Sequence, residues 1–149
     1  MKTAKAQGPK TKSANRIHAA TRASVARDIM TADPMVIDAD ASVGDAIEIL
    51  ATLEIRHLPV MRGKRLVGIL SDRDLRELDG GADKASRTVA SVMNTNVISV
   101  EPDASLVEVC ETLIDQRVGA VPVVESHDDE LVGIVSYIDV LKDLIGGAE

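Results

Sequence analysis

The feature that most constrains this chain is an internal repeat, which covers most of its 149 residues. At a spacing of 63 residues, Pro59 in the first copy matches Pro122 in the second. Further along, the spacing is 65, as between Gly68 and Gly133, so we place a two-residue insertion in the polar run 126–129. Self-similarity at a fixed spacing indicates one supersecondary unit used twice.

Each copy predicts the same order of elements, β-α-β-β-α, from its hydrophobic spacing and its turn residues. The predicted ranges are 35–37, 42–53, 58–61, 66–70 and 72–78 in the first copy, and 97–100, 105–116, 121–124, 131–135 and 137–144 in the second. Ser42 and Ser105 are the expected N-caps of the longer helices, and Ser105 with Glu108 predicts the better capping box. Residues 79–86 link the copies.

The predicted fold class is therefore α/β of the α+β type, with two β-α-β-β-α repeats. A single unit of roughly 55 residues would be only marginally stable, because so small a chain buries too little surface. We therefore expect the two repeats to pack face to face as a pseudo-two-fold pair that shares one core.

The core must be built almost without aromatic residues, since Tyr137 is the only one in the chain. A planar ligand would therefore have to lie between aliphatic side chains. Cys110 is the only cysteine, which excludes an internal disulfide and a thiolate metal cluster. Because it matches Ile47 at the 63-residue spacing, we expect a buried small hydrophobic residue and not a nucleophile.

Charge and hydropathy argue against several classes of protein. The net charge of −7 disfavours nucleic-acid binding in general. No apolar run approaches the roughly 20 residues that span a bilayer, and no signal-peptide pattern is visible, so we expect a cytoplasmic protein without a membrane partner. The 3 histidines lack metal-ligand spacing, and no catalytic triad or carboxylate pair emerges, so neither a metal site nor an enzyme is expected.

Positive charge gathers at the start of the chain, in residues 1–24. This composition predicts a disordered basic arm. The arm could contact nucleic acid, an acidic partner or the acidic surface of the protein itself. It lacks interleaved aromatic residues, so sequence-specific recognition of nucleic acid is not expected.

Three features recur in the same order in both copies. They are a short segment ending in Met30 or Met93, a strand start of the form hydrophobic-Pro-Val at Pro59 or Pro122, and a closing G-h-h-S-x-x-D motif in residues 68–74 and 133–139. In this order the chain resembles a tandem pair of cystathionine-β-synthase (CBS) domains, a Bateman module, over about residues 25 to 145.

The resemblance implies one CBS domain over residues 25–80 and another over 87–145, in a stand-alone module that regulates rather than catalyses. Members of the family bind adenosine nucleotides in clefts between the two copies, and the modules commonly pair again into a homodimer. No required cofactor is implied; AMP, ADP or ATP is the expected regulatory ligand, and S-adenosylmethionine or NAD stays open. The protein target is not implied.

The serine and aspartate of each closing motif are the first candidates for ligand contact: Ser71 with Asp74, and Ser136 with Asp139. A helix N-terminus presents unpaired N–H groups to a phosphate, and the serine hydroxyl adds a donor. The family assigns the aspartate to the two hydroxyls of a ribose. The alternative is that serine and aspartate only cap their helix.

The two copies differ around these motifs. Arg73 could donate to a phosphate or lie on an exposed helix surface, and Tyr137 could stack on a base or cover apolar surface. In the family, the residues that begin this strand, at Pro59 and Pro122, border the cleft. Arg56 and His57 come shortly before Pro59 and could therefore contact a phosphate, and the alternative is that they lie in a solvated loop. By their position in the family, four apolar residues are the candidates to line the adenine slot. The alternative is that they belong to the core: Val36, Ile37, Val97 and Ile98.

Three functions therefore compete. The leading hypothesis is an adenosine-nucleotide sensor that acts through a partner or a change of oligomer. The second is a dimerisation scaffold whose clefts hold no ligand, and the third is a nucleic-acid-associated regulator that uses the basic arm. The differences between the two closing motifs predict that the two clefts bind unequally.

Overall fold

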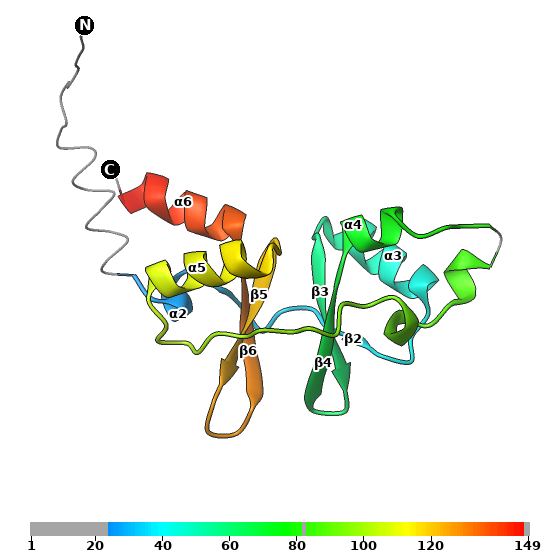
Figure 1. Cartoon of the computed structure of the whole chain (residues 1–149), viewed down its shortest axis with the longest axis horizontal. Coiled ribbons are helices and arrows are strands. Elements are labelled where there is room, and N and C mark those ends of the chain that lie inside the picture. Colours follow the sequence, from blue (N-terminus) through cyan, green and yellow to red (C-terminus); the bar gives the residue numbers. More distant parts are fainter. Residues whose placement is uncertain (1–23, 82, 148–149) are drawn as a thin grey trace, which may run out of the picture.

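The protein consists of two similar halves, each a β-hairpin with its helices on the outer side (Figure 1). The structure, a computed structural model, describes residues 24–81 and 83–147. The predicted basic arm therefore lies outside the described residues, apart from Ser24. Within the described part, no helix is both long and apolar enough to cross a membrane.

The elements alternate along the chain as the repeat predicts. The first half contains β2 (Ile37–Asp38), α3 (Val43–Leu53), β3 (His57–Arg62), β4 (Arg65–Ser71) and α4 (Asp72–Arg76). The second contains α5 (Leu106–Gln116), β5 (Ala120–Glu125), β6 (Glu130–Ser136) and α6 (Tyr137–Gly147). Before these elements come α2 (Ala26–Ile29) and β1 (Thr31–Ala32) in the first copy, and the short 3-10 helices η1 (Lys84–Ser86) and η2 (Val89–Ser91) in the second.

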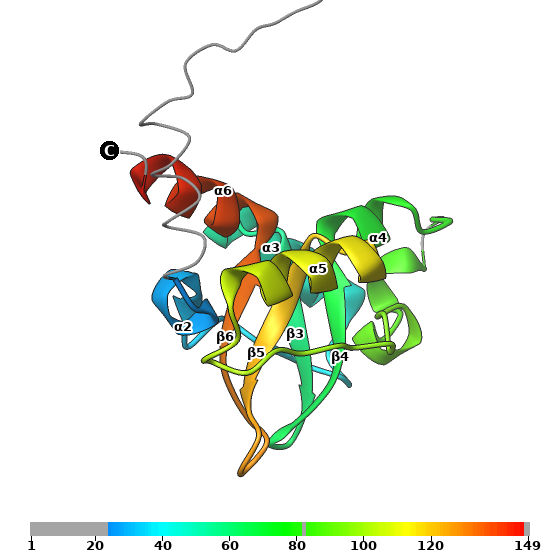
Figure 2. The same cartoon turned by 60° about the vertical axis from the view of Figure 1, so that its left-hand side comes forward.

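Each repeat begins with a short segment that crosses to the other half of the molecule; we call residues 26–33 and 89–96 the leading segments. Strand β1 of the first leading segment pairs antiparallel with β6 of the second repeat, Thr31 opposite Ile134. The equivalent bridge in the second leading segment joins Asn94 to Ile69 of β4. Figure 1 and Figure 2 show the two hairpins as neighbours, and in Figure 1 the chain crosses from one half to the other after each leading segment.

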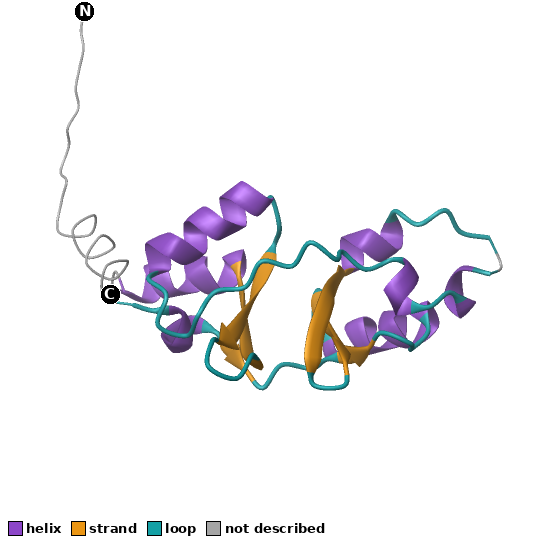
Figure 3. Ribbon diagram, turned by 60° about the horizontal axis from the view of Figure 1, so that its bottom comes forward, coloured by secondary structure: helices purple, strands orange, loops and turns teal. Residues whose placement is uncertain are grey.

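Of the two sheets in the described part of the chain, the first contains a parallel strand from its own repeat, and the second is antiparallel throughout. Strand β2 pairs with β3, so the first sheet has the order β2-β3-β4, and the other sheet has the order β1-β6-β5. The two hairpins share one register, with a bulge after Val60 in β3 and after Val123 in β5. Figure 3 shows the strands as two neighbouring groups with helices around them.

A methionine of each leading segment packs against a glycine of the other repeat. A Cβ atom added to Gly133 would lie 2.8 Å from Cγ of Met30, and one added to Gly68 would lie 2.9 Å from Cγ of Met93. These distances are shorter than van der Waals contact allows. The recurring glycine of the closing motif is therefore explained by the close approach of the recurring methionine.

The expectation of one shared core is wrong. The structure has two separate hydrophobic clusters, one for each half. Ala26 of the first leading segment is fully buried in the cluster of the second repeat, and Val89 of the second leading segment is fully buried in the cluster of the first. The exchange of leading segments, and not a common core, ties the repeats together.

Several boundaries differ from the sequence prediction. The strand predicted at 97–100 is not formed; only Val100 makes a parallel bridge, to Val123. The strand predicted at 35–37 shrinks to β2. Both segments are short because each must leave the partner repeat and join its own sheet within a few residues. The helix predicted at 72–78 ends at Arg76, and α6 continues to Gly147.

The helix caps at Ser42 and Ser105 are confirmed, but the second is not the better of the two. In each helix the serine hydroxyl accepts one bond of 3.0 Å from a backbone N–H, that of Asp45 or of Glu108. The reciprocal bond of a full capping box is found instead at Ser71.

Candidate functional site

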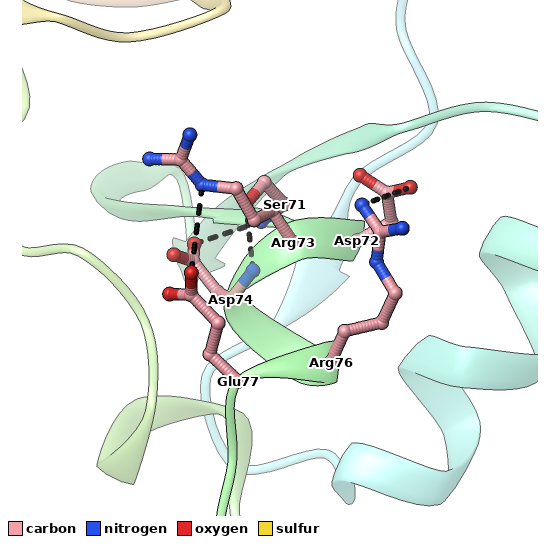
Figure 4. Close-up of polar contacts among 6 residues, drawn as sticks. All are labelled: Ser71, Asp72, Arg73, Asp74, Arg76 and Glu77. Carbon is pink, nitrogen blue, oxygen red and sulfur yellow. Dashed lines mark hydrogen bonds and ion pairs between the residues drawn. The ribbon is translucent and has the colours of Figure 1, made fainter.

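The two closing motifs form the same strand-to-helix turn. The N–H of Asp74 donates to the Ser71 hydroxyl at 3.0 Å, and the Ser71 N–H donates to Oδ2 of Asp74 at 3.1 Å (Figure 4). In the second repeat the Asp139 N–H donates to the Ser136 hydroxyl at 3.2 Å, and the Ser136 N–H donates to Oδ2 of Asp139 at 2.8 Å. Both serines and both aspartates therefore cap their helices.

Capping leaves part of each carboxylate open. Within the described part of the chain, Oδ1 of Asp74 and Oδ1 of Asp139 accept no hydrogen bond. Both aspartates are half-buried, the cap holds each carboxylate in place, and each residue lines a hollow in the surface. An ordered carboxylate oxygen with no partner is suited to accept a hydrogen bond from a hydroxyl group of a ligand.

The Asp74 carboxylate opens on a cavity of about 360 Å³ between the repeats, which we call the Asp74 cavity. One wall comes from the first repeat, from β3, β4 and α4. The other comes from the second repeat, from the end of α5, the start of β5 and Tyr137. The polar, charged and aromatic part of the lining, with one glycine, consists of Arg56, His57, Ser71, Asp72, Arg73, Asp74, Arg76, Asn94, Gln116, Arg117, Gly119 and Tyr137.

The Asp139 carboxylate opens on a cavity of about 290 Å³, the Asp139 cavity, which has the corresponding construction. Its walls come from α6 and β6 of the second repeat, from the end of α3 in the first, and from the first leading segment. The lining residues include Thr31, Pro34, Met35, Glu54, Arg56, His57, Ser136, Tyr137, Ile138 and Asp139.

His57 and Tyr137 line both cavities and so stand between them. The imidazole lies over Gly119, where an added Cβ would be 2.9 Å from Nε2 of His57 and 3.7 Å from the Tyr137 ring. At the 63-residue spacing, Gly119 matches Arg56 and Ala120 matches His57. Small residues in the second repeat thus make room for the large ones in the first.

The environment of His57 lowers its pKa below the ordinary value of 6.5. Desolvation by burial is the largest cause, because the charged imidazolium loses hydration. The carboxylates of Asp72 and Asp74 act in the opposite direction, and the guanidinium of Arg56 adds to the lowering. In the free protein at neutral pH this side chain is therefore uncharged.

The predicted adenine-slot residues are placed differently in the two repeats. Val97 and Ile98 line a small hollow that adjoins the Asp74 cavity, and Pro122 lies at the same hollow. Val36 and Ile37 instead line a separate groove near the hairpin turns, and Ile37 is in the core. The reason is a shift in alignment: at the 63-residue spacing, Val97 and Ile98 match Pro34 and Met35, and these two line the Asp139 cavity.

The remaining predicted residues divide between cavity and core. Arg56, His57, Arg73 and Tyr137 all lie at the Asp74 cavity. Pro59 is fully buried in β3, and its side chain lines neither cavity.

Two charged residues that were not predicted from the sequence lie at the cavities. Glu54 follows α3 and Arg117 follows α5, and both have left-handed backbone conformations, with φ of 55° and 54°. Glu54 lines the Asp139 cavity and Arg117 lines the Asp74 cavity. Their 63-residue spacing was a signal in the sequence, but only the exchange of walls between repeats shows which cavity each one reaches.

Cys110 is half-buried and packs against the core of the second repeat. Burial raises the pKa of its thiol, and the nearby carboxylate of Glu111 raises it further. These contacts agree with the expected packing role. In residues 24–81 and 83–147, no group of three His, Cys, Asp or Glu side chains is arranged to hold a metal ion.

Comparison with known proteins gives consistent matches. The family model of the CBS domain matches residues 26–81 and again residues 89–146. Inosine-5′-monophosphate dehydrogenase of Methanocaldococcus jannaschii is 30% identical over 127 residues, which are 85% of this chain and 25% of that protein. The chain thus spans about a quarter of the length of this relative.

Two solved structures have the same fold. A CBS domain pair in complex with 5′-methylthioadenosine and S-adenosyl-L-methionine is 28% identical, with a TM-score of 0.73, and the match covers 85% of this chain and 98% of that one. The protein CBSX2 in complex with AMP is 27% identical, with a TM-score of 0.72, and the match covers 82% and 96% of the two chains.

Proposed function

The chain belongs to the CBS domain family, and we propose that it is a regulatory module that binds an adenosine ligand in the clefts between its two repeats. One observation carries the proposal: each S-x-x-D turn holds an ordered carboxylate at the rim of a cavity to which both repeats contribute a wall. A ligand there would touch both halves at once.

The proposed roles follow from the geometry of each cavity. The open carboxylate oxygen of Asp74 or Asp139 accepts from the ribose hydroxyls. The base lies between aliphatic side chains of a leading segment and the residues beside it, such as Val97 and Ile98 at one cavity and Pro34 and Met35 at the other. In two related structures the ligands are adenosine compounds: AMP in one, 5′-methylthioadenosine and S-adenosyl-L-methionine in the other.

A ligand can regulate only if it binds one arrangement of the module more tightly than another. Because each cavity has walls from both repeats, occupancy would favour the arrangement in which the walls are correctly spaced. The proposed output is therefore a change in the packing of the two halves, passed to a partner. The proposal includes no catalysis by this chain.

We also propose that the module forms a homodimer through its helices. Large apolar side chains are exposed on α5 and α6, among them Ile114 at 71% and Ile145 at 66%. Sedimentation over a range of concentrations tests this: Ile114→Lys should shift the dimer toward monomer, and a wild type that stays monomeric throughout would contradict the proposal.

The proposed ligand binding is tested by thermal unfolding of the full chain with AMP, ADP, ATP, NAD and S-adenosylmethionine. A ligand at 100 times its dissociation constant should stabilise the fold by about 2.7 kcal/mol. Asp74→Ala and Asp139→Ala should each remove the response of one cavity.

A matched control separates loss of a ligand contact from loss of a helix cap. Oδ2 of Asp28 accepts from the backbone N–H of Val25 at 3.0 Å, the same kind of cap, but Asp28 lines neither cavity. Asp28→Ala should lower stability and keep the ligand response. No response of the wild type to any adenosine compound would refute the proposed function and favour the ligand-free scaffold.

A further inference from the structure

The two cavities are related by the repeat, yet they carry opposite charge. Four arginines and two aspartates line the Asp74 cavity: Arg56, Arg73, Arg76, Arg117, Asp72 and Asp74. The Asp139 cavity has one arginine, Arg56, with Glu54 and Asp139. This difference is not a general property of the surface, because it arises at particular matched positions.

The first such position is the residue that ends the long helix. Glu54 and Arg117 are 63 residues apart and share the left-handed conformation, so each projects from the same point of its repeat. Each faces the cavity of the other repeat's aspartate. The Asp74 cavity thus receives a cation where the Asp139 cavity receives an anion.

The second position is on the short helix that follows the closing motif. At the 65-residue spacing, Arg73 matches Ile138 and Arg76 matches Leu141. Within the described residues, Arg73 and Arg76 make exposed ion pairs, with Glu77 at 4.0 Å and Asp72 at 3.6 Å (Figure 4). Pairs of this kind contribute little, so both guanidinium groups can turn to a ligand.

The third observation concerns the other two arginines of the Asp74 cavity. Arg56 and Arg117 are exposed, and neither has a carboxylate within 4.0 Å in the part of the chain that the structure describes. The two repeats together therefore give this cavity four arginines, and each guanidinium group can make a bidentate pair with a phosphate. Their number matches a chain of phosphates.

We infer that the Asp74 cavity selects an adenosine polyphosphate, with two or more phosphates, whereas the Asp139 cavity takes an adenosine compound whose tail is uncharged or cationic. The pair Glu54 and Arg117 is the main determinant of this difference. The inference rests on the proposed function, because it assumes that the adenosine part binds at both aspartates.

The test is calorimetric titration of the full-length chain with adenosine, ADP, ATP and inorganic tripolyphosphate. Asp139→Ala confines adenosine binding to the Asp74 cavity. In that background ATP should bind at least tenfold more tightly than adenosine. Arg117→Asn should weaken ATP about tenfold, because a charge-assisted bond is lost, and should leave adenosine nearly unchanged.

Asparagine is chosen because it tolerates the left-handed conformation of Arg117. Arg117→Lys should restore part of the ATP affinity. Arg65→Asn is the matched control: Arg65 is an exposed arginine at the start of β4 that lines neither cavity, so ATP affinity should not change. The reciprocal change, Glu54→Arg in an Asp74→Ala background, should raise the affinity of the Asp139 cavity for ATP.

The outcomes separate the two proposals. If adenosine and ATP bind the Asp74 cavity equally, or if Arg117→Asn and Arg65→Asn weaken ATP to the same extent, the inference fails while the proposed function stands. If no adenosine compound binds, the proposed function fails. In that case, binding of tripolyphosphate that depends on Arg117 would still support an anion-selective cavity. If tripolyphosphate does not bind either, the inference is overturned as well.

Discussion

At the scale of single residues, close contacts across the two repeats explain why certain positions are small. Gly68 and Gly133 face methionines of the opposite leading segments, and Gly119 faces the His57 imidazole. A side chain at any of these positions would have to displace its neighbour. The same contacts put a histidine in the wall between the two cavities.

The contact between Met30 and Gly133 predicts a loss of stability for Gly133→Ala. The added methyl group overlaps the methionine side chain, and overpacking of this kind costs about 1 to 3 kcal/mol. Urea unfolding measures the free energy change. Gly146→Ala is the control, because nothing lies within 4 Å of a Cβ added there. If the clash is the cause, Gly133→Ala should cost less in a Met30→Ala background.

The lowered pKa of His57 predicts a loss of stability as pH falls. The unfolded chain takes up a proton near pH 6.5, whereas the folded protein takes it up only at a lower pH. The contribution of His57 to the free energy of unfolding is therefore fully present above pH 6.5. It declines as the pH falls from 6.5 through the lowered pKa of the folded protein. An anionic ligand beside the imidazole favours its charged form, so affinity should rise over the same range.

The free energy of unfolding at several pH values between about 5 and 8 checks this prediction. His57→Gln should show a smaller decline toward acid pH than the wild type does. His127→Gln changes an exposed histidine in the second hairpin turn and serves as the control. Equal pH dependence in the wild type and His57→Gln would show that the buried imidazole is not responsible.

At the scale of elements, each helix and hairpin has an equivalent in the other repeat, and local chemistry fixes most of their ends. Ser42, Ser71, Ser105 and Ser136 accept N-terminal N–H groups, and Gly63 turns the first hairpin with φ of 64°. The exceptions are the C-terminal ends of α3 and α5. There the left-handed residue, usually glycine or asparagine, is Glu54 or Arg117.

This departure predicts a gain in stability for Arg117→Gly. A left-handed conformation costs a residue with a side chain about 1 kcal/mol, and glycine avoids that cost. Urea unfolding without ligand should show an increase of up to about that amount. The same variant should bind ATP more weakly. Higher stability together with weaker ATP binding is the result expected if Arg117 serves ligand binding at the expense of stability. An Arg117→Gly variant that is less stable than the wild type would contradict this prediction.

At the scale of the whole molecule, the order of units in space differs from their order in sequence. The first leading segment completes the second core, and the second leading segment completes the first. Four backbone hydrogen bonds hold the exchanged segments in equivalent ways. In the first leading segment, the N–H of Ala26 donates to the carbonyl of Ala104 and that of Arg27 to the carbonyl of Pro102. In the second, the N–H of Val89 donates to the carbonyl of Ala41 and that of Ala90 to the carbonyl of Ala39. Neither half is complete without chain from the other repeat.

The exchange predicts which fragment folds. Residues 34–96 contain the first repeat with the leading segment of the second, including the buried Val89 and the contact of Met93 with Gly68. Residues 25–87 have the same length but lack both. Burying a Val or Met side chain contributes about 1.5 to 3 kcal/mol, so only fragment 34–96 should unfold cooperatively. Circular dichroism during thermal unfolding compares them, and equal stability would contradict the exchange.

Much of this protein could be predicted from its sequence, because the determining interactions are local. The repeat predicted two β-α-β-β-α units, hydrophobic spacing predicted the helices and hairpins, and the S-x-x-D motifs predicted two capped turns. Helix caps and hairpin turns depend on residues a few positions apart, which a sequence displays directly.

Only the tertiary structure decided how the two units are joined and what each cavity contains. The two separate cores, the packing of Met30 against Gly133 and the place of Arg117 at the Asp74 cavity all depend on how the two repeats pack against each other. Contacts of this kind join residues far apart in the sequence, such as Met30 and Gly133, which are 103 positions apart (133 − 30). Equal spacings in sequence do not say whether a segment packs on its own repeat or on the other. The sequence alone therefore determined the units and their turns, and packing between repeats decided the cavities and their charge.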